Sequence, residues 1–126
     1  MTDPQVTGLR CIEYNVPDLA KTSRFYENCW GLAKVAEEDG THWLRATGAE
    51  HHIVVLHEGG KASVNRINFA APDNNAVDGL YAKLSGLGIS TEGVPEDLSG
   101  PGGGYGFSFA DRDGLRYAIS CDVAKH

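Results

Sequence analysis

Alternating apolar and polar residues predict a strand near the start of the chain and several more along it. Over residues 9–16, Ile12, Tyr14 and Val16 share one face, and polar side chains occupy the other. Apolar residues at helical spacing predict two helices, one from about Leu19 to a C-cap at Gly31 and one over residues 74–87. Further strands are predicted at residues 34–38, 41–47, 51–57, 66–71, 89–93, 105–110 and 115–121, and a Gly- and Pro-rich loop at residues 95–104.

The order strand, helix and three strands occurs twice, at a constant offset of 55 residues. The segment IEYNVPD (residues 12–18) corresponds to INFAAPD (residues 67–73), and a Tyr and a Gly-Leu pair follow each segment at the same spacing. One β-α-β-β-β unit therefore occurs twice, over residues 8–58 and 64–123 of a single α+β domain that spans residues 1–126. A groove shared by the two units is the predicted site.

Composition narrows the classes of partner. The 126 residues are 41% hydrophobic and 22% charged, which is ordinary for a globular domain. The net charge is −6 and no run of Lys or Arg occurs, so we expect neither nucleic acid nor an anionic membrane as a partner. No apolar run approaches the ~20 residues that span a bilayer.

The cysteines and the N-terminus predict a cytoplasmic protein. The chain has three cysteines, Cys11, Cys29 and Cys121, and no CxxC motif. An odd number without such a motif favours reduced thiols over a disulfide framework. Residues 1–8 are polar and contain no apolar core of a signal peptide.

Four short motifs resemble those of the vicinal oxygen chelate superfamily, which includes glyoxalase I, bleomycin-resistance proteins and extradiol dioxygenases. They are VPDL (residues 16–19), FYENCWGL (residues 25–32), GGGYGF (residues 102–107) and DRDG (residues 111–114). The similarity is greatest to the N-terminal domain of extradiol ring-cleaving dioxygenases. It implies a glyoxalase-like fold, in which two modules curl a mixed sheet into a half-open, pseudo-two-fold barrel around a ligand. Trp30, within the second motif, is expected to pack in the core.

The superfamily's metal ligands are His and Glu side chains on the first and last strands of each unit. The corresponding positions here fall on Cys11, Arg66 and Ala118 and near Val54, and none of them matches. The resemblance therefore implies a domain with no metal cofactor, with Fe or Mn as the metal to expect if this interpretation is wrong.

Three histidines near the end of the first unit are the local substitutes for a metal ligand. Strand alternation predicts that His52, Val54 and Leu56 face the cavity and that His51 and His57 face away. One histidine is a poor metal site, because such sites need several convergent ligands.

The predicted cavity is polar, and two interpretations of it stay open. Its charged groups either form an internal Glu13–Arg66 or Glu13–Arg116 network without a ligand, or they bind a small aromatic or anionic molecule. In the second case an Arg would hold a carboxylate, and Trp43 or Tyr105 would stack on a ring. The predicted ligand-binding residues are Glu13, Trp43, His52, Arg66, Asn68 and Arg116.

Three functions are compatible with these residues. The first is a metal-free, non-catalytic domain that accompanies a dioxygenase. The second is a stand-alone homodimer that sequesters a small molecule, as bleomycin-resistance proteins do. The third is a metal-dependent dioxygenase or lyase with a rearranged site that uses His52 and Cys11. The sequence alone leaves open whether the chain is an enzyme.

Overall fold

Residues 5–124, which the computed structural model describes, form two helices and eight strands. Neither helix in this part of the chain is long and apolar enough to cross a membrane. The elements are β1 (Gly8–Val16), α1 (Leu19–Cys29), β2 (Ala33–Glu38), β3 (Thr41–Arg45), β4 (Val54–Glu58), β5 (Ser63–Ala70), α2 (Asn74–Gly86), β6 (Thr91–Asp97), β7 (Tyr105–Ala110) and β8 (Arg116–Cys121).

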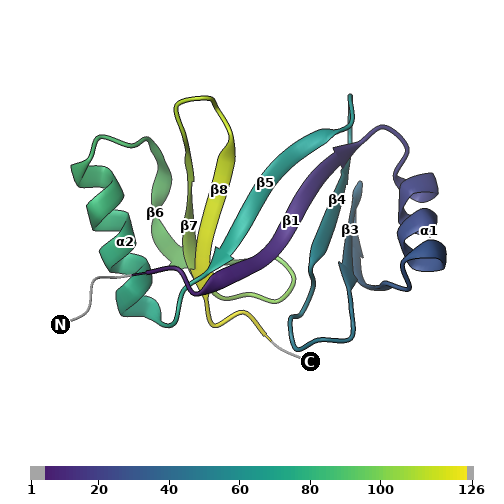
Figure 1. Cartoon of the computed structure of the whole chain (residues 1–126), viewed down its shortest axis with the longest axis horizontal. Helices are drawn as coiled ribbons and strands as arrows, with labels where there is room; N and C mark the ends of the chain where they lie inside the picture. The colour runs from purple at the N-terminus through teal and green to yellow at the C-terminus, as the bar shows by residue number, and fades with distance from the viewer. Residues whose placement is uncertain (1–4, 125–126) are drawn as a thin grey trace.

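All eight described strands belong to one mixed sheet, in the order β2-β3-β4-β1-β5-β8-β7-β6. The sheet arches, with β1 and β5 at its middle and one helix outside each end (Figure 1). The first strands of the two repeats pair with each other antiparallel, whereas β1–β4 and β5–β8 are parallel. This open arch of two β-α-β-β-β units confirms the predicted glyoxalase-like α+β fold.

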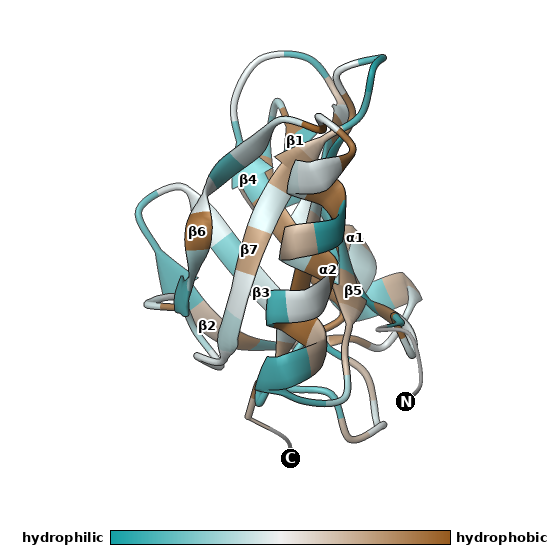
Figure 2. Ribbon diagram, turned by 90° about the vertical axis from the view of Figure 1, so that its left-hand side faces the viewer, coloured by the Kyte–Doolittle hydropathy of each residue, from teal (hydrophilic) through white to brown (hydrophobic). Residues whose placement is uncertain are grey.

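Each helix covers its own hydrophobic core and begins at the predicted residue. The Asp18 side chain accepts a hydrogen bond from the Lys21 amide (3.1 Å), and the Asp73 side chain accepts one from the Ala76 amide (2.8 Å). Leu44 and Leu56 lie in the core beneath α1 and are fully buried. Viewed from the α2 end in Figure 2, hydrophobic and hydrophilic segments both occur around α2, as expected for a helix with one face on a sheet.

The pairing of β1 with β5 follows the symmetry of the internal repeat. Ile12 and Ile67, which the 55-residue offset relates, lie directly opposite each other. Each strand contains one extra residue at a bulge, and these residues, Arg10 and Asn65, are related by the same offset. A pseudo-two-fold axis therefore passes between Ile12 and Ile67.

Three local predictions were wrong. Strand β4 begins at Val54 and not at residue 51. Strand β6 continues to Asp97 beyond Pro95, because it is an edge strand whose pairing with β7 is irregular between Glu92 and Glu96. Trp30 is 62% exposed and not in the core. It ends α1 and makes a T-shaped contact with the ring of Tyr26 (4.9 Å between centroids).

Candidate functional site

A cavity of about 270 Å³ lies under the middle of the arch and is called the central cavity here. Its walls come from β1, β3, β5 and β8, from His52 just before β4, and from the loop of residues 98–104. The loop passes beneath the central strands (Figure 1). The cavity therefore lies between the two repeats, where the sequence predicted a shared groove.

Five of the six predicted ligand-binding residues line this cavity, namely Glu13, Trp43, His52, Arg66 and Asn68. Arg116 does not. Its Nε and Nη2 instead donate to the two carboxylate oxygens of Glu92 (both 3.1 Å). Tyr105, the second candidate for stacking, packs with the core under α2 and donates its hydroxyl hydrogen to Asp78 (2.6 Å).

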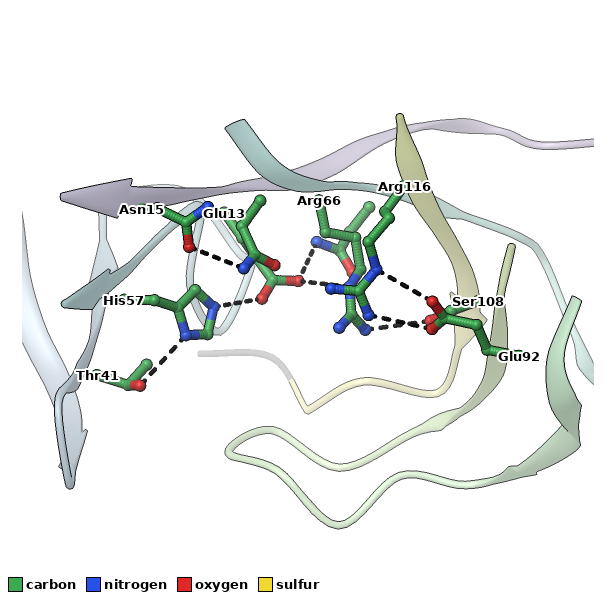
Figure 3. Close-up of polar contacts among 10 residues, drawn as sticks. Glu13, Asn15, Thr41, His57, Arg66, Glu92, Ser108 and Arg116 are labelled. Atoms are coloured by element: carbon green, nitrogen blue, oxygen red, sulfur yellow. Dashed lines mark hydrogen bonds and ion pairs between the residues drawn. The ribbon is translucent and has the colours of Figure 1, made fainter. Parts of the chain in front are cut away.

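The Glu13 carboxylate is the centre of a hydrogen-bonded network, called the Glu13 network here (Figure 3). His57 Nε2 donates to Oε1 and Asn68 Nδ2 donates to Oε2, each at 2.7 Å. With its proton on Nε2, the His57 ring accepts at Nδ1 from the Thr41 hydroxyl (3.2 Å). Burial by itself would raise the pKa of Glu13, but these two hydrogen bonds and the nearby Arg66 charge lower that pKa below its usual value.

Arg66 approaches the same carboxylate without a hydrogen bond to it. Its Nε lies 3.7 Å from Glu13 Oε2, and its Nη1 donates to the Ser108 hydroxyl (3.1 Å). The Nε atom is buried, and no described residue accepts a hydrogen bond from it. The Glu13–Arg66 ion pair is therefore present, while the alternative Glu13–Arg116 pair is absent from the described part of the chain.

The predictions that Val54 and Leu56 face the cavity and that His57 faces away from it were wrong. Val54 and Leu56 pack in the core beneath α1, so His57 points to the opposite face and reaches Glu13. His52 nevertheless lines the cavity, because residues 51–53 precede the strand and do not alternate with it. The run of four apolar residues from Ile53 to Leu56 conceals the alternation, and His57 and Thr41 were therefore missed.

Two other groups that line the cavity, Cys11 and His52, are held in their neutral forms. Burial, with a further contribution from Glu13, raises the pKa of the Cys11 thiol to about 12. Burial and the neighbouring His51 lower the pKa of His52 to about 4. The Nδ1 atoms of these two histidines are 2.9 Å apart, so one ring donates to the other. At neutral pH the permanent charges on the cavity wall thus come from the Glu13 carboxylate and from the guanidinium groups of Arg10 and Arg66.

A glycine-rich loop closes the cavity from below, and the sequence did not predict this role. Leu98 and Pro101 of the loop line the cavity. Gly102 accepts a hydrogen bond from the Ala124 amide (2.8 Å). Gly104 has φ of 104°, and a Cβ there would lie 2.8 Å from both the Cys121 carbonyl oxygen and a Val123 methyl group. Only glycine therefore lets the loop pack this closely on the end of β8.

The residues present do not fit the metal that the fold family implies. Among residues 5–124, no group of three or more His, Cys, Asp or Glu side chains is placed to hold a metal ion. Cys11 is a neutral thiol, Ala118 offers no donor atom, and Arg66 brings a positive charge into the cavity. The Glu13 oxygens already accept from His57 and Asn68.

The sequence model of the Glyoxalase/Bleomycin resistance protein/Dioxygenase superfamily matches residues 8–119, and the chain belongs to this superfamily. The match agrees with the arch, the two-fold repeat and the cavity between the units. No curated protein matches the chain.

Solved structures place the chain among larger members of the superfamily. The Mn(II)-bound glyoxalase from Novosphingobium aromaticivorans is 39% identical, with a TM-score of 0.92 over 96% of this chain and 40% of that one. A variant of homoprotocatechuate 2,3-dioxygenase from Brevibacterium fuscum is 27% identical, with a TM-score of 0.88 over 98% of this chain and 34% of that one. Homoprotocatechuate 2,3-dioxygenase from Arthrobacter globiformis is also 27% identical, with a TM-score of 0.88 over 98% of this chain and 38% of that one. The chain thus spans less than half the length of these relatives.

Proposed function

We propose that this chain is a glyoxalase/dioxygenase-type domain that binds no metal of its own and accompanies a catalytic region without cleaving a substrate itself. The observation that carries the proposal is the Glu13 network. The Glu13 carboxylate lines the cavity and accepts hydrogen bonds from His57 and Asn68 at its two oxygens, and the Arg66 guanidinium group stands at the position where the superfamily resemblance expects a metal-binding histidine.

The lengths of the similar proteins support the companion role. The chain covers 40% of the Mn(II)-bound glyoxalase and 34% of the Brevibacterium dioxygenase, so each of those proteins has room for a second region of comparable size. In this proposal the fold supplies a scaffold, and the metal chemistry belongs to such a region.

Metal titration of the purified chain tests this proposal. The protein is loaded with Mn(II), or anaerobically with Fe(II), desalted, and assayed for bound metal and for catechol cleavage. We expect far less than one metal ion per chain and no cleavage. One tightly bound ion per chain that is lost in His52→Ala or Cys11→Ala would instead support a rearranged metal site and contradict the proposal.

A second candidate function is binding of a small aromatic or anionic molecule in the central cavity. The specific support is a cavity of about 270 Å³ that combines Trp43 with Arg66, whose buried Nε has no hydrogen-bond acceptor among the described residues. Aromatic carboxylates such as benzoate are suitable probes. Exposed Trp30 would contribute a background signal, so fluorescence titration is best done in Trp30→Phe, where Trp43 is the remaining tryptophan.

A saturable change in Trp43 fluorescence that disappears in Arg66→Met would support ligand binding. Arg116→Met is the matched control, because Arg116 lies off the cavity and we expect it to leave binding unchanged. A flat titration across benzoate, phenylacetate and their uncharged amides would contradict this second function without bearing on the metal.

A further inference from the structure

A second cavity, called the side cavity here, lies beside the central cavity and has a volume of about 740 Å³. It is formed where the start of β1, the ends of β5 and β8 and the segment between β3 and β4 come together. Arg10 and Val123 line both cavities and so lie between them. The wall of the side cavity has an apolar part, from Ala71, Pro72 and Val123 among others, and a charged part.

The internal repeat explains why this space is open. Gly8 pairs with Ala70 across β1 and β5. The 55-residue offset relates this pair to Ser63 and Asn15, which pair at the other end of the same two strands. There, Asn15 Nδ2 donates to the Ser63 hydroxyl (3.0 Å), and Asn65 Nδ2 donates to Asn15 Oδ1 (2.9 Å). A Cβ added at Gly8 would instead meet no atom of the described residues within 4 Å. The side cavity therefore lies where small residues replace a hydrogen-bonded polar trio.

Arg10, the counterpart of Asn65 in the repeat, is fixed in the wall of the side cavity. Its Nε donates to the Ser120 hydroxyl (3.1 Å), and its Nη2 donates to the Ser120 carbonyl oxygen (3.0 Å). Its Nη1 donates to Glu50 Oε2 (3.0 Å), and only 7% of Arg10 is exposed. Three of its five N–H groups are thus used, and Glu50 balances its charge.

The charged part of the wall favours a positive ligand. Glu50 and Asp122 contribute two carboxylates, against the single guanidinium group of Arg10. The Thr7 hydroxyl adds an oxygen that can accept a hydrogen bond. The net charge of −6 on the whole chain also attracts cations and repels anions. A molecule that matches this wall is positive at one end and apolar along its body.

We propose that the side cavity binds a small aliphatic amine in its protonated form. The ammonium group pairs with the carboxylates of Glu50 and Asp122, and the alkyl chain lies along the apolar part of the wall. Pockets for small ligands usually measure roughly 300–1,000 Å³ and combine apolar walls with a few polar groups. The site is separate from the central cavity, where the candidate ligand is aromatic or anionic.

NMR titration of the ¹⁵N-labelled chain with butylammonium tests the proposal. n-Butanol and butyrate are the matched probes, because they have similar chains without the positive charge. We expect saturable shifts of the Thr7, Ala71 and Val123 amides with butylammonium, and tighter binding of it than of either other probe. A flat titration with butylammonium overturns the proposal, and so does equal or tighter binding of n-butanol or butyrate at these amides.

Two variants connect this binding to the side cavity. Asp122→Asn removes one carboxylate and suits the backbone, because Asp122 has φ of 56° and asparagine tolerates this left-handed region. We expect butylammonium to bind about tenfold more weakly to it. Gly8→Ser combined with Ala70→Asn introduces the side chains of the related pair, which should occupy the space and abolish binding. Unchanged affinity in either variant overturns the proposal.

Glu96→Gln is the matched control, since Glu96 is an exposed carboxylate on the edge strand β6, away from the side cavity. It removes the same charge as Asp122→Asn and should leave butylammonium binding unchanged. Urea unfolding checks that every variant stays folded. None of these outcomes depends on whether the central cavity binds a metal or an anion, so the two proposals fail independently.

Discussion

The two faces of the central β1–β5 pair share one backbone symmetry but carry opposite kinds of side chain. On the outer face, positions related by the repeat hold similar apolar residues, as Ile12 and Ile67 do. On the cavity face, the repeat relates Cys11 to Arg66 and Glu13 to Asn68. The backbone symmetry thus rests on apolar residues and turns, while the cavity side chains differ between the repeats.

The Glu13 network depends on this difference between the repeats, because its partners on β5 are Asn68 and Arg66. Glu13 lies directly opposite Arg66 across the two strands. If the second repeat also carried Glu at position 68, a second carboxylate would lie where Asn68 now donates to Glu13, and like charges that close destabilise a sheet. Divergence of the two repeats therefore gives one carboxylate several donors and leaves the sheet intact.

The largest effect is expected from removing the carboxylate at the centre of the cavity face. Glu13→Ala leaves the Arg66 charge and the His57 and Asn68 donors without their acceptor, and should lower the free energy of unfolding by about 3 kcal/mol. Ile12→Val, on the outer face of the same strand, should cost only about 1 kcal/mol. Urea denaturation measures both. Equal losses would contradict the distinction between the faces.

A pH-dependent effect is expected next, from His52. Its folded pKa of about 4 lies below the ordinary 6.5, so its contribution to stability is complete above pH 6.5 and is lost as the pH falls toward 4. The loss should be about 2 kcal/mol once residual solvent contact of the ring is allowed for.

The slope of unfolding free energy against pH measures this contribution, and His52→Asn should flatten it between pH 6.5 and about 4.5. Glu13 acts at lower pH, because its folded pKa is below 4.5 and its contribution is lost only as the carboxylate becomes protonated. An unchanged slope in His52→Asn would show that another group titrates.

A smaller effect is expected from Arg116, the predicted site residue that lies off the cavity. Its pairing with Glu92 is exposed, so Arg116→Ala should cost about 0.5 kcal/mol and less in high salt. Arg66→Ala should cost distinctly more, because it leaves the carboxylate of a partly buried pair without its cation. Similar costs for the two substitutions would show that the cavity pair is no stronger than the exposed one.

The last prediction concerns chemical labelling of the thiols, which should leave the stability of the fold unchanged. Cys29 is exposed, whereas Cys11 and Cys121 are buried and burial raises the pKa of both. We expect one of the three cysteines to react rapidly with a thiol reagent in the folded protein, and all three after unfolding. Rapid reaction of Cys11 would mean that the cavity opens readily to solvent.

The parts of the fold that follow local rules were predictable from sequence. The Pro-Asp caps, the Gly-Leu helix ends and the repeat offset define both units, because each depends on a few neighbouring residues. Most cavity residues were also found, since period-two alternation assigns a face to each side chain on β1 and β5.

What could not be predicted depends on contacts between distant segments. The orientation of His57 follows from where β4 begins, and pairing with β1 and β3 sets that boundary. Arg116 was expected in the cavity, but the bidentate contact with Glu92 on β6 holds it elsewhere. The loop beneath the cavity is held by the chain after β8, which no local pattern encodes.

The pairings at the middle of the sheet also bear on how quickly the chain folds. Ile12 pairs with Val54 on one side and with Ile67 on the other. Strand β1 therefore completes its pairing only when segments more than 40 residues away in the sequence have come together. Hairpins β2–β3 and β7–β8 close short loops and should form early. Because non-local contacts slow folding, refolding should take on the order of milliseconds to seconds, with the join between the two repeats forming late.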